Sequence, residues 1–150
     1  PDVRTWTVQR GAFTHTFTFK PGIPAPERVV EVTLAGVERP KVPDPKWGST
    51  VPLVDARLVA ELSSPAGQLL ARYRLHPVPL AQGKYAFHFT PTEAGLHGLR
   101  LTGQLADGRE VSAEMKVPVD VWPLPSELQG TGDAAAVGAR RPVVRTPLSK

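Results

Sequence analysis

The sequence contains no cysteine and a single methionine among its 150 residues. Without cysteine the chain forms no disulfide, carries no thiolate nucleophile and builds no cysteine-ligated zinc site. It has no apolar run near the roughly 18 residues that a membrane span requires, and its first ten residues lack the basic start and apolar stretch of a signal peptide. Because the numbering begins at Pro1, an export signal or a membrane or lipid anchor further upstream is left open.

A concentrated stripe of basic residues is also lacking, although the formal net charge is +4. Lys and Arg are interleaved with Asp and Glu throughout, whereas nucleic-acid binding needs basic side chains that neutralise several phosphates together. We therefore expect no nucleic-acid partner. The sequence also has no Gly-x-Ser-x-Gly elbow, no phosphate-cradling glycine loop and no His-Glu-x-x-His helix, so we expect no enzyme and keep catalysis only as a remainder.

Proline and glycine are abundant instead, with 17 and 13 residues, and both interrupt helices and mark turns. Between these turns, apolar and polar residues alternate with the period of two that is typical of a half-buried strand. The alternation predicts seven strands, over residues 13–19, 29–34, 51–62, 69–75, 84–90, 97–105 and 110–119. Between the last two strands, Asp107-Gly108 predicts a two-residue hairpin turn.

Seven short strands with turns between them indicate an all-β, immunoglobulin-like Greek-key β-sandwich. We assign this domain to residues 13–122, with a leader or edge segment at residues 1–12. Residues 123–150 are rich in Pro, Gly, Ala and Arg and have no periodic apolar face, so we predict a disordered, flexible tail or linker there.

Three stretches carry a resemblance to a known group of proteins. VPLVDARLVAELSSPAG, GKYAFHFTPTEAGLHGLRLTG and DGREVSAEMKVPV resemble the bacterial extracytoplasmic immunoglobulin-like modules, including the YtkA-like group. The resemblance spans about Val29 to Val119 and implies a periplasmic or other extracytoplasmic location. It also implies use as a spacer, a binding domain or a copper-handling accessory. At His97 the chain departs from the family, which commonly has an aromatic residue, often Tyr, at this corner.

The stretch from Ala35 to Pro52 is the predicted binding surface, since a long connection without periodicity is usually functional or flexible. Within it, Trp47 is flanked by Asp44 and Lys46, and an exposed indole there would anchor a protein partner. The alternative is that Trp47 folds back and covers the open end of the sandwich.

Four histidines supply the other candidate chemistry. We expect His15 to be a partly buried core residue that is hydrogen-bonded to backbone. The alternative copper site would use His88 and His97 with His76 or Glu93. His88 is predicted to point outward and His97 inward, so the two converge only if the corner between their strands twists strongly.

The predicted function is a non-catalytic extracytoplasmic domain without a cofactor, which binds a protein or serves as a structural module in an envelope assembly. A periplasmic copper-binding or metallochaperone-type accessory is the alternative.

Overall fold

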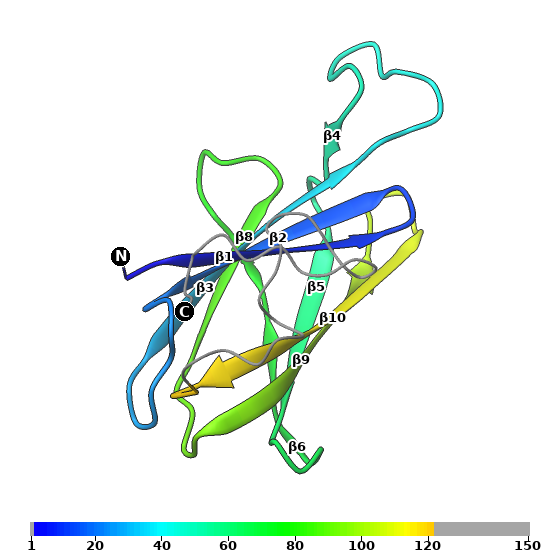
Figure 1. Cartoon of the computed structure of the whole chain (residues 1–150). Coiled ribbons are helices and arrows are strands. Elements are labelled where there is room, and N and C mark those ends of the chain that lie inside the picture. Colours follow the sequence, from blue (N-terminus) through cyan, green and yellow to red (C-terminus); the bar gives the residue numbers. More distant parts are fainter. Residues whose placement is uncertain (1, 122–150) are drawn as a thin grey trace.

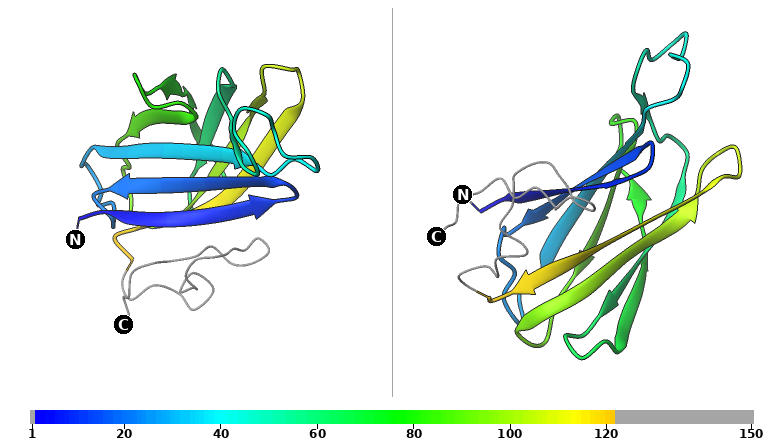
Figure 2. Two further views of the ribbon diagram at one scale, coloured as in Figure 1. Left: turned by 90° about the horizontal axis from the view of Figure 1, so that it is seen from above. Right: turned by 45° about the vertical axis from the view of Figure 1, so that its right-hand side comes forward.

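The computed structural model describes residues 2–121, and these residues form only strands, turns and loops (Figure 1). Two antiparallel sheets face each other across a shared core, a sandwich-like arrangement that confirms the predicted all-β class (Figure 2). The six-stranded sheet contains β1 (Arg4–Arg10), β2 (Phe13–Lys20), β3 (Val30–Glu38), β8 (Lys84–Phe89) and β7 (His76–Pro77) in this order, with β4 (Val51–Pro52) paired to β3. The four-stranded sheet has the order β10 (Glu110–Val119), β9 (Gly95–Gln104), β5 (Arg57–Ser63) and β6 (Leu69–Arg74).

The strands form where the sequence alternates, because every second side chain enters the space between the sheets. On β2 and β3 the buried side chains include Phe17, Phe19, Val32 and Leu34, while the threonines between them are partly exposed. Both sheets contribute to one core, as predicted, and its members include Phe17, Phe19, Val32, Leu34, Leu58, Leu62, Phe87, Leu99, Leu101, Val111 and Val117.

The predicted strand over residues 51–62 was wrong, because the structure divides it between the two sheets. β4 pairs with β3, whereas β5 pairs with β6 and β9. Between them the Tyr85 hydroxyl donates to the Leu53 carbonyl at 2.6 Å and accepts from the Ala56 N–H at 2.9 Å. Asp55 has a φ of 56°, a left-handed conformation that a continuous strand excludes.

The strand total also differs from the predicted seven, since residues 2–121 contain ten strands. β4 and β7 are two residues long, too short to show any periodicity. β1 was predicted only as a leader or edge segment. It pairs along its full length with β2, and its Trp6 side chain is buried in the core.

A β-bulge changes the predicted faces of β6. A period of two over the predicted strand 69–75 places Leu69 on the same face as Ala71. In the structure Leu69 lies opposite Ser63 and Ala71 opposite Leu62, which leaves Leu70 without an opposing residue. An extra residue of this kind reverses the alternation on one side of the bulge. Leu69 consequently lies at the surface, with 51% of its area exposed.

Two predicted connections differ in length from the expectation. The loop over residues 35–52 begins later, because β3 continues to Glu38, and β4 ends it, so the loop itself covers residues 39–50. The turn between β9 and β10 has three residues and not two. The Leu105 N–H donates to the Arg109 carbonyl at 2.7 Å, so the turn consists of the three residues between them. Gly108, the last of the three, has a φ of 93°, as in a type I turn with a bulge.

Trp122 and the predicted tail over residues 123–150 lie outside the described residues. Within residues 2–121 the structure contains no helix that is long and apolar enough to cross a membrane.

Candidate functional site

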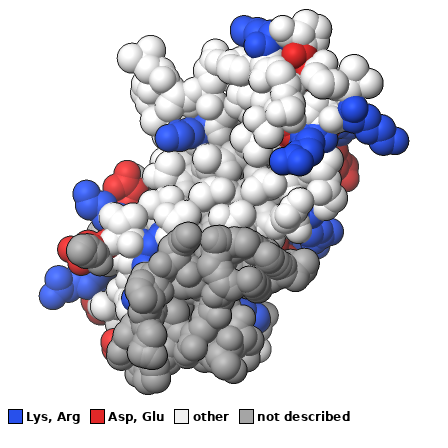
Figure 3. All heavy atoms as spheres, turned by 45° about the horizontal axis from the view of Figure 1, so that its top comes forward, with Lys and Arg blue, Asp and Glu red and all other residues white. Residues whose placement is uncertain are grey.

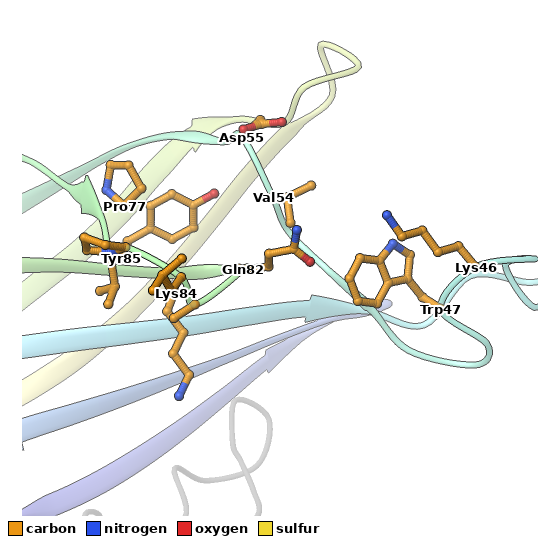
Figure 4. Close-up of a pocket in the computed structure, with 13 residues that line it drawn as sticks. Lys46, Trp47, Val54, Asp55, Pro77, Gln82, Lys84 and Tyr85 are labelled. Carbon is orange, nitrogen blue, oxygen red and sulfur yellow. The ribbon is translucent and has the colours of Figure 1, made fainter.

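Two loops project from one end of the sandwich (Figure 1). Residues of both loops line a cleft. The loop over residues 39–50 follows β3, and the loop over residues 78–83 precedes β8. Because β3 and β8 are antiparallel neighbours, with Ala35 opposite Lys84, both loops emerge at the same end. The cleft has a volume of about 570 Å³ and is lined by Lys46, Trp47, Val54, Asp55, Pro77, Val78, Pro79, Leu80, Ala81, Gln82, Gly83, Lys84 and Tyr85 (Figure 4).

The tip of the loop over residues 39–50 is held by its own hydrogen bonds. Asp44 and Gly48 exchange two backbone hydrogen bonds of 2.8 and 2.9 Å. The Asp44 carboxylate also accepts the N–H groups of Lys46 at 2.8 Å and Trp47 at 3.0 Å. Asp44, one of the three predicted partner-binding residues, is therefore placed where it orders the loop that carries the other two.

Trp47 lies between the two arrangements that the sequence suggested. Its side chain is half-buried and lines the cleft, on the same side as Lys46, whose Nζ atom is 5.0 Å from the centre of the indole ring (Figure 4). The ring is thus supported by a cation–π contact and still faces the cleft. An indole held in this way combines a large apolar surface with one free N–H donor.

The loop over residues 78–83 contributes a cleft residue that sequence reasoning missed. Leu80 is fully exposed, with a relative accessibility of 106%, and has a φ of 61°. Three backbone hydrogen bonds fix this loop: Val78 N–H to the Lys84 carbonyl, Ala81 N–H to that of Val78, and Lys84 N–H to that of Ala81. The only signal in the sequence was a large apolar residue in a short, proline-flanked connector without periodicity.

The floor of the cleft is the ring of Tyr85. Its hydroxyl is occupied by the backbone of Leu53 and Ala56, and burial raises its pKa above the usual value. Tyr85 therefore offers its ring and not a reactive phenolate. The lining residues are otherwise apolar, apart from the amide of Gln82 and the charges of three side chains. This chemistry suits binding.

The residues of the alternative copper site are distributed over separate parts of the fold. His76 lies opposite Ala86, so it is a diagonal neighbour of His88 on the exposed face of β7 and β8. His97 is buried in the core, with Nδ1 3.2 Å from the Gly95 carbonyl, and Glu93 is exposed at the corner. Among residues 2–121, no three or more His, Cys, Asp or Glu side chains are grouped so that they could hold a metal ion.

His15 is more deeply buried than predicted, and the expected hydrogen bond to backbone was wrong. Its side chain has a relative accessibility of 1%, and neither ring nitrogen has a hydrogen-bond partner in the protein. Burial, and secondarily the positive charge of Arg10, lowers its pKa from 6.5 to about 4. His15 is consequently a neutral core residue at physiological pH.

Comparison with known proteins adds no family to this description. No protein-family model matches the sequence, and no curated protein matches it.

Proposed function

We propose that this protein is a non-catalytic binding module that captures a protein partner in the cleft between the loops over residues 39–50 and 78–83. The observation that carries the proposal is that a half-buried Trp47 and a fully exposed Leu80, from two different loops, line one cleft. Tryptophan is enriched among the residues that dominate binding energies, and exposed apolar side chains around a concave surface mark interaction sites.

We further infer that the sandwich has the immunoglobulin-type Greek key. The order β2-β3-β8-β7 in one sheet and β10-β9-β5-β6 in the other supports this, because it corresponds to strands A-B-E-D and G-F-C-C′ of that fold. β1 would then be an added edge strand. Loops at the ends of such sandwiches commonly bind partners, which agrees with the position of the cleft. With the resemblance to extracytoplasmic modules, we place the proposed function outside the cytoplasm, in an envelope assembly.

Replacing Trp47 with alanine tests the proposal. We expect Trp47→Ala to lose the partner that the wild-type protein captures from cells of its source, because the indole is the largest apolar side chain that lines the cleft. We expect the midpoint of thermal unfolding to stay within a few degrees, since the side chain lies outside the core cluster. Val29→Ala, an exposed apolar residue outside the cleft, is the matched control and should retain capture. Equal capture by both variants, or a large loss of stability in Trp47→Ala, would refute the proposal.

Copper binding is kept as the second candidate, on one observation: His76 and His88 share an exposed face of adjacent strands. Two imidazoles can bind Cu(II), although a stable site needs further ligands. Titration with Cu(II) against a mild chelator tests this directly. Stoichiometric uptake that His88→Gln abolishes would support copper binding, and uptake that is absent or unchanged in the variant would exclude it.

A further inference from the structure

We propose that the tip of the loop over residues 39–50 docks reversibly onto an anionic lipid surface, with Val42 among the lipid headgroups and the neighbouring cations against their phosphates. The inference goes beyond the proposed function, because it concerns the outer end of this loop and does not depend on what the cleft binds. Three features of the described residues lead to it: an exposed valine, an excess of unpaired cations, and a loop backbone with few free donors.

Val42 lies on the part of the chain that projects from the sandwich. The loop leaves β3 and reaches beyond both sheets (Figures 1 and 2). Val42 has 75% of its area exposed, and Pro43 after it is exposed as well. One exposed valine is ordinary on a protein surface, so its surroundings decide what it does. A projecting apolar side chain contributes to membrane binding when basic side chains accompany it.

Basic side chains do accompany Val42. The loop has three cations, Arg39, Lys41 and Lys46, and a single acid, Asp44. All three cations are exposed, and none forms an ion pair among the described residues. The Asp44 carboxylate is turned onto the loop itself, where it accepts two backbone N–H groups. An anionic membrane attracts such cations when they lie within a Debye length of its surface.

The base of the loop offers these cations no free carboxylate. Glu38, the last residue of β3, accepts two hydrogen bonds of 2.8 Å from Arg109. Arg10 ends β1 in the same cross-strand row as Glu38 and is also exposed. Figure 3 brings this end of the molecule forward and shows Lys and Arg side chains projecting from it. The positive charge at the loop is therefore open to an external anionic surface.

The backbone of the loop favours lipid over a protein at this tip. Residues 39–48 include three prolines, which carry no N–H. Five further N–H groups of this range donate within the protein, those of Arg39, Asp44, Lys46, Trp47 and Gly48. Within the described part of the chain, Lys41 and Val42 are the two residues of this range whose N–H groups have no acceptor. Such a backbone costs little to bring against lipid, whereas a protein interface normally relies on direct hydrogen bonds.

Flotation of the whole chain with lipid vesicles is the first test. We expect the wild type to bind vesicles of equal parts phosphatidylglycerol and phosphatidylcholine at low salt, and to be released as the salt concentration rises. Vesicles of phosphatidylcholine alone should bind it much less. Lys41→Gln should lower the partition coefficient about fivefold, the contribution of one cation near an anionic surface. Val42→Ser should lower it at least about threefold, because it removes the apolar contact.

Two matched variants at the opposite end of the sandwich are the controls. Lys20 ends β2 and Val29 precedes β3, and both side chains are exposed. Lys20→Gln and Val29→Ser should bind the anionic vesicles like the wild type. Losses as large as those of Lys41→Gln and Val42→Ser would show that the loop tip is not the contact. A wild-type chain that ignores anionic vesicles at low salt would also overturn the proposal.

The absence of cysteine from the sequence allows a decisive test. Val42→Cys and Val29→Cys each create a single attachment point for an environment-sensitive fluorophore. Anionic vesicles should shift the emission of the label at position 42 to the blue and leave the label at position 29 unchanged. Equal shifts at both positions, or a shift only at position 29, would contradict docking by the loop tip. Capture of a protein that Trp47→Ala abolishes is a separate result, so either proposal can fail while the other stands.

Discussion

His15 points in the direction that the strand pattern predicts, but its ring lacks the hydrogen bond that we expected. It takes the inward position that its parity with Phe17 and Phe19 predicts, and it stacks on Phe13 with the ring centres 6.4 Å apart. The alternation could predict this direction because it depends only on neighbouring residues. The missing hydrogen bond could not be predicted, because it depends on β1 and β3, which lie on either side of β2.

We predict that His15 makes the protein less stable in acid. The folded chain protonates this imidazole only at a pKa of about 4, whereas the unfolded chain does so near 6.5. Between these values the unfolded chain binds the additional proton, so stability falls as the pH drops from 6.5 to 4, by up to about 3 kcal/mol. Urea unfolding of the wild type and His15→Leu at several pH values measures this. His15→Leu should lose that part of the pH dependence and remain at least as stable at pH 7, because it removes an unpaired buried polar group.

His88→Gln is the matched control, because His88 is an exposed histidine on the outer face of β8. It should keep the wild-type pH dependence of the free energy of unfolding. The same acid sensitivity in His15→Leu as in the wild type would show that His15 is not its source.

Among the strands, β9 contains three glycines, and two of them, Gly98 and Gly103, have different surroundings that the sequence does not reveal. At Gly103 a Cβ atom would overlap the Arg57 carbonyl oxygen and lie 2.8 Å from Leu58 Cδ2. At Gly98 the nearest atom, Ser63 Cβ, would be 3.6 Å away, which is an ordinary contact. The close approach of β5 to β9 at Gly103 therefore depends on the absence of a side chain.

We predict that Gly103→Ala destabilises the protein by about 3 kcal/mol, since backbone must move to relieve the overlap. Gly98→Ala should change the free energy of unfolding by less than about 1 kcal/mol, because alanine is accommodated in an extended, partly exposed position. Denaturant unfolding of both variants compares the two sites within one strand. Equal effects would show that β5 and β9 are not in close contact at Gly103.

The strands were predictable where their pattern is local and unpredictable where a distant residue interrupts it. β2 and β10 follow their alternation almost residue by residue. The break between β4 and β5 is set by Tyr85, which is 29 residues from Ala56 in the sequence and contacts it only in the folded chain. The bulge at Leu70 likewise arises from pairing with β5. Neither interruption leaves a mark within its own segment.

At the scale of the whole molecule, the two sheets are connected at the end that carries the cleft loops. Arg109, which directly precedes β10, donates two hydrogen bonds of 2.8 Å to the carboxylate of Glu38, the last residue of β3. The same guanidinium lies 5.7 Å from the centre of the Phe13 ring. This pairing lowers the pKa of Glu38 and links the four-stranded sheet to the strand that precedes the loop over residues 39–50.

Only one of the two loops that line the cleft could be predicted from the sequence. Sequence reasoning identified the loop that carries Trp47, because proline and charge without periodicity mark a functional connection. It missed Leu80, because the two loops are brought together by the pairing of β3 with β8 and not by any local signal. A binding surface that two distant segments build depends on strand order, which alternation alone does not specify.

Site-specific photo-crosslinking in cells of the source tests the central claim most directly. A photoreactive amino acid replaces Leu80 in one variant and Leu70 in the other, two exposed leucines of which only Leu80 lines the cleft. If the cleft is the working surface, irradiation should join the Leu80 variant to a partner protein and leave the Leu70 variant free. Crosslinking at Leu70 and not at Leu80 would contradict the account.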